Sequence, residues 1–230
     1  MAAQMAQSTP LGQSTPAYLR DKVGLPSEKS KLDLAMAGDL YDRIKRRTLD
    51  VSGIGAVDGV IDYTLVQVPR VLADGRRQLL LGHKKRGFGV GKINGFGGKF
   101  EVGESAEDCA LRELREESGV VATSIRWRAQ LLFTFRDSGK LMRVHVFEVT
   151  KFSGEPQETD EMRPEWFDVS AMPYSRMWHD DTFWMPTFLE GPNFEAWCVA
   201  PSLRGRNQIL KMYQNPKIAA IADDAIRRQV

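Results

Sequence analysis

The chain has 230 residues, enough for one compact domain with extensions or for two small domains. Apolar residues make up 42% of it, so a sizeable core can be buried. The 32 Lys and Arg residues nearly balance the 30 Asp and Glu residues, which argues against a dedicated nucleic-acid-binding protein with a basic face. The balance does not exclude a small anionic substrate, because a pocket needs only a few charges.

Cysteine content and hydropathy bear on the cellular compartment. Cys109 and Cys198 are the two cysteines, and nothing else in the sequence suggests secretion, so we expect free thiols in a reducing compartment. No stretch approaches the roughly 18 apolar residues of a membrane-spanning helix, and the N-terminus has no apolar signal core. We therefore expect a cytoplasmic protein with no membrane partner, with the nucleus and the mitochondrion as alternatives.

The first 55 residues differ in composition from the rest. Residues 1–26 are rich in Ala, Gln, Ser, Thr and Pro and repeat the tetrapeptide Gln-Ser-Thr-Pro. They can bury too little apolar surface to offset their ordering entropy, so they are predicted to be a disordered tail. Residues 27–55 are predicted to form an N-terminal helical extension, because apolar residues recur every four positions from Leu32 to Ile44.

Alternating apolar and polar residues from Ile61 onward predict strands and two hairpins. The first hairpin would turn at Asp74-Gly75 and the second at 137–139, where Asp, Ser and Gly follow one another. The predicted strands are Ile61–Leu72, Gln78–Gly82, Trp127–Phe135, Leu141–Val149, Glu165–Val169 and Phe194–Val199.

The end of the chain, 214–230, predicts an amphipathic helix. Asn215 would cap it, Pro216 fits the first turn, and apolar residues from Ile218 to Ile226 share one face. Strand pairs with interspersed helices between 56 and 213 predict the α+β class, as an α/β/α sandwich in which helices flank a mixed sheet.

An acidic helix is the most informative segment of the sequence. It is predicted to begin after the cap residue Ser105 and to end at Gly119. Glu113, Glu116 and Glu117 fall within an arc of roughly 100° on it. These neighbours repel one another, and Mg²⁺ would relieve the repulsion because it prefers carboxylate oxygens and bridges to phosphates. The plain alternative is a solvated helix whose arginines pair with the acids.

The same segment resembles the signature of the Nudix family, G-x5-E-x7-R-E-U-x-E-E-x-G-U, in which U is apolar. The matching residues are Gly98, Glu104, Arg112, Glu113, Leu114, Glu116, Glu117, Gly119 and Val120. The resemblance implies an α/β/α sandwich that hydrolyses nucleoside diphosphates linked to another group, using Mg²⁺ or Mn²⁺.

The resemblance also implies roles for single residues. The implied metal ligands are Gly97, Glu113, Glu116, Glu117 and Glu161. Arg112 would orient carboxylates through charge-assisted hydrogen bonds, Glu104 would support the loop, and Gly98 would bring the main chain close to the metal. Lys99 would add a positive charge near the phosphates. The candidates for the general base are Glu113, Glu117 and Glu161.

Stretches outside this signature resemble the eukaryotic Nudix enzymes that hydrolyse oxidised purine nucleoside triphosphates. The stretches are LLLGHKKRGFGVGKINGFGGK (79–99), RVHVF (143–147), DEMRPEWF (160–167) and MWHDDTFWMP (177–186). By this resemblance the residues that hydrogen-bond the purine are Asn94, Asp180 and Asp181. Those that wall the base are Phe88, Phe133, Met142 and Trp178, with Thr64, Lys84 and Phe135 close by.

Each of these residues also has a plain structural interpretation. Asn94 with the following glycine is a common turn dipeptide, Phe133 could belong to a strand core, and Asp180 with its neighbour could cap a helix. Their matching order and spacing favour a flat purine pocket over these separate interpretations. Two positions depart from the animal enzymes, with Ile93 in place of Trp and His179 in place of Pro, and either could shift specificity.

Three functions follow from the sequence. The first is Mg²⁺-dependent hydrolysis of 8-oxo-dGTP, and of 2-hydroxy-dATP, to monophosphate and pyrophosphate. The second keeps this chemistry for another substrate, such as ADP-ribose, a dinucleoside polyphosphate or capped RNA. The third is a non-catalytic Nudix sensor module. The expected partner is a small purine nucleotide, with no stable nucleic-acid binding, and the sequence leaves the oligomeric state open.

Overall fold

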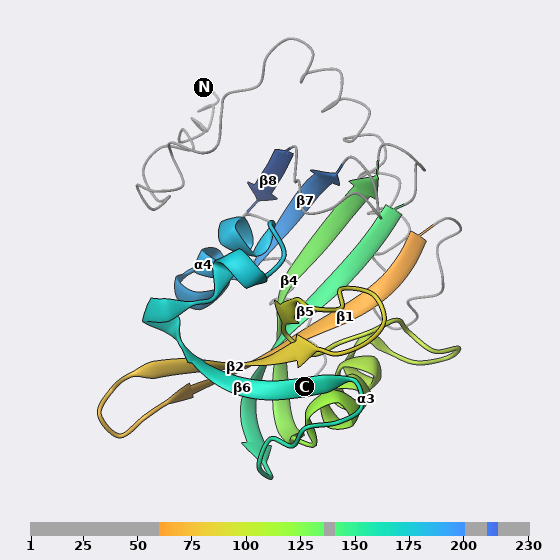
Figure 1. Cartoon of the computed structure of the whole chain (residues 1–230). Helices are drawn as coiled ribbons and strands as arrows, with labels where there is room; N and C mark the ends of the chain where they lie inside the picture. The colour runs from red at the N-terminus through yellow and green to blue at the C-terminus, as the bar shows by residue number, and fades with distance from the viewer. Residues whose placement is uncertain (1–59, 136–140, 201–210, 216–230) are drawn as a thin grey trace, which may run out of the picture. The chain divides into compact units, whose positions relative to one another are not determined.

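A computed structural model describes residues 60–135, 141–200 and 211–215 (Figure 1). The predicted tail 1–26, the predicted extension 27–55 and residues 216–230 of the predicted C-terminal helix lie outside these ranges. None of the helices in the described part of the chain is long and apolar enough to cross a membrane.

Among the described residues, eight strands form one sheet in the order β3-β2-β1-β5-β4-β7-β8, and β6 pairs with β2 beside this path. The first four are β1 (Val60–Val71), β2 (Arg77–Lys84), β3 (Ile93–Asn94) and β4 (Val121–Phe135). The others are β5 (Leu141–Ser153), β6 (Met162–Asp168), β7 (Phe194–Ala200) and β8 (Lys211–Asn215).

The sheet is mixed, as the sequence predicts. The first part of β1, Val60–Gln67, runs parallel to β5, and its last part, Val68–Val71, pairs antiparallel with β2. Strand β4 runs antiparallel to β5 and parallel to β7. Both predicted hairpin pairings are confirmed. Strand β1 is shifted by one residue from its predicted range, and β2, β4 and β5 are longer than predicted. Because β1 changes partner midway, it joins two differently oriented parts of the sheet (Figure 1).

In the described part of the chain, two α-helices flank the sheet, α3 (Ala106–Ser118) and α4 (Asp181–Glu190). Helix α3 begins as predicted, because the Ser105 hydroxyl accepts a hydrogen bond from the Asp108 amide at 3.1 Å. It ends at Gly119, whose φ of 72° is a conformation that glycine adopts at no steric cost. Two short 3₁₀ helices, Val169–Ala171 and Tyr174–Arg176, precede α4.

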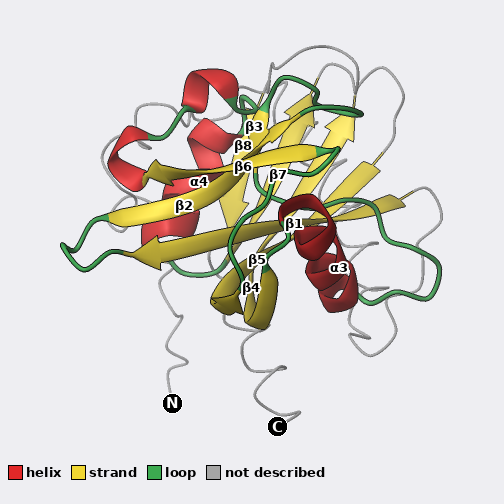
Figure 2. Cartoon of the chain, turned by 60° about the horizontal axis from the view of Figure 1, so that its bottom comes forward, coloured by secondary structure: helices red, strands yellow, loops and turns green. Residues whose placement is uncertain are grey.

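The two faces of the sheet bury separate cores. On β1, Leu65 packs in the core that contains Trp184 and Phe188 of α4, whereas Val66 packs with Leu114 of α3. Successive strand residues point to opposite faces, so each helix covers one face of the sheet (Figure 2). The predicted mixed sheet with helices on its two faces is therefore confirmed for the described residues.

Several predicted boundaries are wrong. Strand β4 begins at Val121 rather than at Trp127, and β5 ends at Ser153 rather than at Val149. Two further boundaries differ for a clear reason. The strand predicted at Glu165–Val169 begins earlier, at Met162, because its whole length pairs with β2, and Val169 already belongs to a 3₁₀ helix. The C-terminal helix was predicted from residue 214, but Gln214 and Asn215 pair with β7 as the end of β8. In both places strand pairing, which local sequence does not encode, sets the boundary.

Candidate active site

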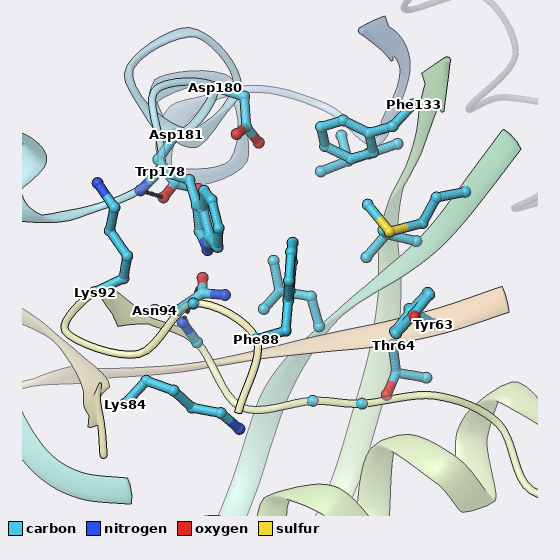
Figure 3. A pocket seen from close by; sticks show the side chains of 18 of the residues that line it. Tyr63, Thr64, Lys84, Phe88, Lys92, Asn94, Phe133, Trp178, Asp180 and Asp181 are labelled. Atoms are coloured by element: carbon cyan, nitrogen blue, oxygen red, sulfur yellow. Dashed lines mark hydrogen bonds between the residues drawn. The ribbon is translucent and has the colours of Figure 1, made fainter. Parts of the chain in front are cut away.

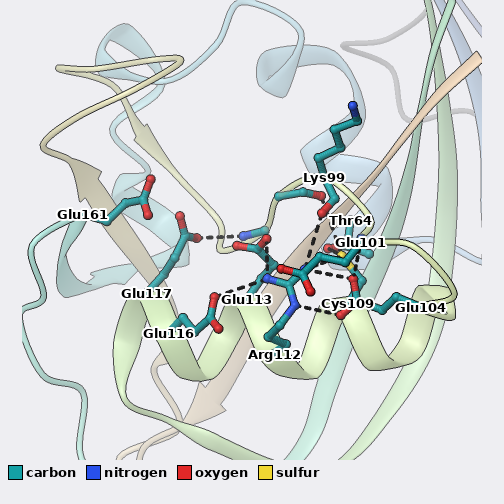
Figure 4. A network of polar contacts seen from close by, with 12 residues as sticks. Thr64, Lys99, Glu101, Glu104, Cys109, Arg112, Glu113, Glu116, Glu117 and Glu161 are labelled. Carbon is teal, nitrogen blue, oxygen red and sulfur yellow. Dashed lines mark hydrogen bonds and ion pairs between the residues drawn. The ribbon is translucent and has the colours of Figure 1, made fainter.

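The acidic side of α3 carries Glu113, Glu116 and Glu117 (Figure 4). Leu114 lies between these acids in the sequence, and its buried side chain anchors the helix in the core. This orientation places the three acids at different depths. Glu117 is 1% exposed, Glu113 is partly buried, and the Glu116 side chain is 60% exposed.

Glu117 is held by a lysine and by the glycine-rich loop. Its Oε1 accepts a hydrogen bond from Lys84 Nζ at 2.7 Å, and its Oε2 accepts one from the Gly97 amide at 2.8 Å. Burial raises the pKa of Glu117 to about 7, although both contacts oppose the rise. Lys84 Nζ also lies 3.0 Å from Glu161 Oε1, and this contact lowers the pKa of Glu161. Lys84 thus bridges α3 and the segment before β6.

Arg112 organises the other acids. It donates two hydrogen bonds to Glu104, at 2.7 and 2.9 Å, and these lower the pKa of Glu104 to about 2. One of its nitrogens also lies 2.8 Å from Glu113 and 3.2 Å from Glu116. Burial raises the pKa of Glu113 despite this contact. Arg112 therefore fixes the orientation of the neighbouring carboxylates.

The loop before α3 passes close to the main chain of β1 and to the Glu113 side chain of α3. A Cβ on Gly97 would lie 2.1 Å from the Thr64 carbonyl oxygen, and a Cβ on Gly98 would lie 2.2 Å from Glu113 Oε1. The Gly98 carbonyl accepts a hydrogen bond from the Thr64 amide at 2.9 Å. The loop main chain is therefore locked between the strand and the acidic helix.

The oxygen donors around α3 match a hard divalent cation in chemistry. Within the described ranges no three His, Cys, Asp or Glu side chains form a ready-made metal site. Two protein cations contact these acids: Lys84 pairs with Glu117 and Glu161, and Arg112 pairs with Glu113 and Glu116. This set of oxygen donors fits a metal. In the arrangement shown, Lys84 and Arg112 neutralise part of the negative charge of the carboxylates.

A cavity of about 330 Å³ opens beside this acidic side (Figure 3). Every residue that the sequence predicts for substrate binding lines it except Lys99, whose side chain is exposed. Glu161 lines it as well, so the cavity reaches the acids. The predicted lining residues are Thr64, Lys84, Phe88, Asn94, Gly97, Gly98, Phe133, Phe135, Met142, Trp178, Asp180 and Asp181.

Aromatic rings give the cavity a flat shape. The Phe88 and Trp178 rings lie 5.1 Å apart at an interplanar angle of 21°, and Phe133 lies 6.5 Å from Phe135 at 10°. Gly89 brings the loop against the indole, since a Cβ there would lie 2.8 Å from a Trp178 ring carbon. Planar walls of this kind suit a planar ligand.

Two adjacent acids close one end of the cavity. Asp181 is buried, and its Oδ2 accepts a hydrogen bond from the Trp178 amide at 2.9 Å. Asp180 Oδ2 accepts one from Trp184 Nε1 at 3.1 Å. Burial raises the pKa of Asp180 to about 6, and burial with the Asp180 charge raises that of Asp181 well above its usual value. The pair lies at the start of α4, yet Asp180 makes no side-chain cap to it.

The family model of the NUDIX domain matches residues 65–188 of the sequence, which contain most of this site. The chain belongs to the Nudix family. Nudix proteins typically depend on a divalent metal, which agrees with the oxygen donors on α3. Because the match contains the acidic helix and most of the cavity lining, it covers the described site.

Curated Nudix relatives resemble the same region. An "Oxidized purine nucleoside triphosphate hydrolase" of Danio rerio is 47% identical over 130 residues, which is 56% of this chain and 82% of the relative. Its Mus musculus counterpart is 44% identical over 132 residues, 57% of this chain and 81% of the relative. A MutT protein structure from Bacillus halodurans has a TM-score of 0.56 at 22% identity, covering 68% of this chain and 98% of that one, which supports the Nudix fold.

The Nudix cavity also has lining residues that the sequence analysis did not assign to it. They are Tyr63, Leu65, Gly89, Lys92, Gly95, Leu131, Val144, Met162 and His179. Alternation along strands could have found some, because Leu131 and Val144 lie two residues from Phe133 and Met142. Of the two departures from the animal enzymes, His179 lines the cavity, whereas Ile93 is fully buried outside it.

Proposed function

We propose that this protein hydrolyses oxidised purine nucleoside triphosphates to the monophosphate and pyrophosphate, and so sanitises the nucleotide pool. The proposed substrates are 8-oxo-dGTP and 2-hydroxy-dATP. The observation that carries the proposal is one cavity with a flat aromatic part, an acid pair at one end and the acidic Nudix helix at the other. The identity of 44–47% to oxidised purine nucleoside triphosphate hydrolases supports the same substrate class.

The acidic end would handle the phosphates. Mg²⁺, or Mn²⁺, would supply charge stabilisation and an activated water there. We assign the ligand role to Gly97, Glu113, Glu116, Glu117 and Glu161. Arg112 keeps Glu113 and Glu116 in place through the contacts described above, and Glu104 in turn holds Arg112. Phosphoryl transfer demands mainly positioning and charge compensation, which this network provides.

Lys84 lies where the carboxylates of the acidic end meet the cavity. Its ammonium compensates Glu117 and Glu161 in the arrangement shown, and its side chain also lines the cavity. These carboxylates would hold a divalent cation, which would supply further positive charge there. Lys84 would hold a positive charge beside the triphosphate.

The other end would recognise the base. Rings from Phe88, Phe133 and Trp178 would cover its faces, while Asn94 and the Asp180-Asp181 pair would hydrogen-bond its edge. An amide both donates and accepts, and a carboxyl group donates only when protonated. Oxidation of guanine at C8 places a hydrogen on N7, so an acceptor there becomes a donor. Buried polar groups that stay unpaired with the wrong base give strong discrimination.

The buried cysteines agree with a reducing compartment, and we place the activity in the cytoplasm. The test is a panel of ordinary and oxidised nucleotides, ADP-ribose, a dinucleoside polyphosphate and capped RNA, each with Mg²⁺, with products separated by chromatography. We expect monophosphate and pyrophosphate from 8-oxo-dGTP. Preferred cleavage of another diphosphate would replace the substrate assignment. Tight binding without turnover of any of them would indicate a sensor module.

A further inference from the structure

Two of the acids assigned to the metal come from different segments of the chain. Glu117 belongs to α3, and Glu161 ends the segment 157–161, which precedes β6. The two side chains lie next to each other (Figure 4), and Lys84 Nζ contacts both, at 2.7 and 3.0 Å. Their relative position therefore depends on how the segment 157–161 is held against α3.

The C-terminal end of α3 provides the attachment. The last carbonyl groups of an α-helix have no partner within the helix. Here the Gln157 amide donates a hydrogen bond to the Ser118 carbonyl at 2.8 Å, and the Thr159 hydroxyl donates one to the Glu117 carbonyl at 3.4 Å. The segment 157–161 thus caps the end of the helix that carries Glu117.

The Thr159 hydroxyl also fixes the main chain of its own segment. Its oxygen accepts hydrogen bonds from the Glu161 amide at 3.2 Å and the Met162 amide at 3.1 Å, as threonine does in tight turns. The Met162 carbonyl, at 3.4 Å, is a second acceptor for its hydrogen. The Glu161 carbonyl in turn accepts a hydrogen bond from the Lys85 amide at 2.8 Å. One hydroxyl therefore joins the main chain of Glu161 to that of Glu117.

We propose that Thr159 is a positioning residue for the metal-dependent reaction, which sets the Glu161 carboxylate against that of Glu117 so that both can hold one divalent cation. The proposal rests on the proposed function, because it takes these two acids as metal ligands. Mg²⁺ demands near-ideal octahedral geometry, so a small displacement of one ligand weakens its binding. Hydrogen bonds behind metal ligands typically contribute about 10–100-fold in metal affinity or activity.

The test compares Thr159→Val, which keeps nearly the same shape without the hydroxyl, with Thr159→Ser, which keeps the hydroxyl. Thr150→Val is the matched control, because Thr150 on β5 also makes two side-chain hydrogen bonds, to the carbonyl and the hydroxyl of Ser124 at 3.2 and 2.7 Å. Calorimetry with Mg²⁺ alone gives the metal affinity, and steady-state kinetics with 8-oxo-dGTP give kcat and KM.

Melting temperatures without metal check that each variant is folded. If the valine variant does not fold, Thr159→Ala removes the same hydroxyl without adding a methyl group and gives the same two readings.

We expect Thr159→Val to weaken Mg²⁺ binding by about tenfold and to lower kcat by at least about tenfold. KM should stay within about threefold of wild type, because the aromatic walls of the cavity keep their contacts. Thr159→Ser should restore both the Mg²⁺ affinity and kcat. Thr150→Val should leave both within about twofold of wild type, although it loses a comparable pair of hydrogen bonds.

Three results would overturn this role. One is an unchanged Mg²⁺ affinity and kcat in Thr159→Val, whatever its melting temperature. Another is a rise in KM with kcat unchanged, and the third is a failure of Thr159→Ser to restore Mg²⁺ binding.

The wild-type protein separates this role from the proposed function. If wild type binds Mg²⁺ and hydrolyses 8-oxo-dGTP and one of these results is found, the Thr159 role alone is wrong. If wild type cleaves another diphosphate instead, the substrate assignment is wrong and the Mg²⁺ affinities still decide the Thr159 role. If wild type neither binds Mg²⁺ nor hydrolyses 8-oxo-dGTP, both are wrong.

Discussion

Glu117 is a buried acid, and its burial points to a functional role. It is 1% exposed, and burial raises its pKa to about 7. An ionised carboxylate in such a place costs stability unless it is paired, and its partners are Lys84 and the Gly97 amide. Glu116 differs, because it is exposed and its Oε2 lies 3.2 Å from an Arg112 nitrogen. The two acids therefore allow separate tests of one metal site.

We predict that Glu116→Gln and Glu117→Gln each lower turnover by orders of magnitude and leave the free energy of unfolding within about 1 kcal/mol of wild type. Each amide loses the charge that would bind the cation. Added Mg²⁺ should raise the melting temperature of wild type, and raise it less in the variants. Glu107→Gln, an exposed acid in the first turn of α3, is the control. Full wild-type activity in excess chelator would show that no metal is needed.

Asp180 should carry a cost in stability. Its pKa is about 6 in the folded protein, and the usual value is 3.8. Since the folded state binds the proton more tightly, stability is greatest below the lower value and is lost as the pH rises through about 6. We predict that Asp180→Asn raises the free energy of unfolding at pH 8, by at most about 3 kcal/mol, while impairing base recognition. Chemical denaturation at low and high pH measures it. A variant less stable than wild type at pH 8 would contradict this.

At the scale of elements, the glycine loop 95–98 and α3 form one unit. Gly97 and Gly98 make different close approaches, since Gly97 meets main-chain atoms of Thr64 and Gly98 meets only the end of the Glu113 side chain. A main chain in a paired strand cannot move aside, whereas a carboxylate can. Substitution at the two positions should therefore have different consequences.

We predict that Gly97→Ala destabilises the protein by several kcal/mol, as overpacking against the main chain does. Gly98→Ala should leave the melting temperature nearly unchanged but displace Glu113 and reduce kcat by at least about tenfold. Thermal denaturation and steady-state kinetics on the same samples separate the two effects. Equal loss of stability in both variants would mean that the Glu113 carboxylate is as fixed as the strand.

Strands β1 and β5 share a buried ion pair on the face covered by α3. Arg143 is fully buried and contacts Asp62 through two nitrogens, one of them at 2.9 Å, with His145 beside them. Burial alone would raise the pKa of the Asp62 carboxyl, but His145 and Arg143 together lower it to about 2. Such a pair is costly to break at one end only.

We predict that Arg143→Met lowers the free energy of unfolding by about 3–5 kcal/mol, because it leaves Asp62 buried and unpaired. The double variant Asp62→Leu, Arg143→Met should recover most of that loss, since it replaces the pair by apolar side chains. Urea denaturation of the two single variants and the double variant gives the coupling energy. Additive losses would show that the two charges do not depend on each other.

The sequence predicts best those elements that local residues determine. Asp74-Gly75 sets a hairpin, and Ser105 and Gly119 bound α3, because turns and caps depend on a few neighbours. The predicted bounds of β6 and the predicted start of the C-terminal helix at residue 214 are wrong, because strand pairing across long separations sets them. In the site, the predicted aromatic residues line one cavity together with Glu161, Asp180 and Asp181, whereas the three predicted acids of α3 are not among its lining residues. Lys92 was missed, since its contact with Met177 spans 85 residues and no motif contains both.

In the described chain as a whole, β1 runs past both ends of the cavity and connects them. Tyr63 and Leu65 line it on the side of α4, while the main chain of Thr64 holds Gly98 beside Glu113. The cavity wall and the loop before the acidic helix therefore share β1, which in the proposed function would set the distance between base and phosphates. An enzyme built this way should discriminate by base while using the same hydrolytic machinery for every nucleotide.

The most direct test of this is the ratio of kcat/KM for 8-oxo-dGTP to kcat/KM for dGTP with Mg²⁺, in wild type and in Asp181→Asn. We predict a wild-type ratio of at least about one hundred, as expected when buried polar groups read a base. The ratio should fall toward one in the variant, while its Mg²⁺-induced rise in melting temperature stays unchanged. A ratio near one in wild type, unchanged in Asp181→Asn, would contradict oxidised purine recognition.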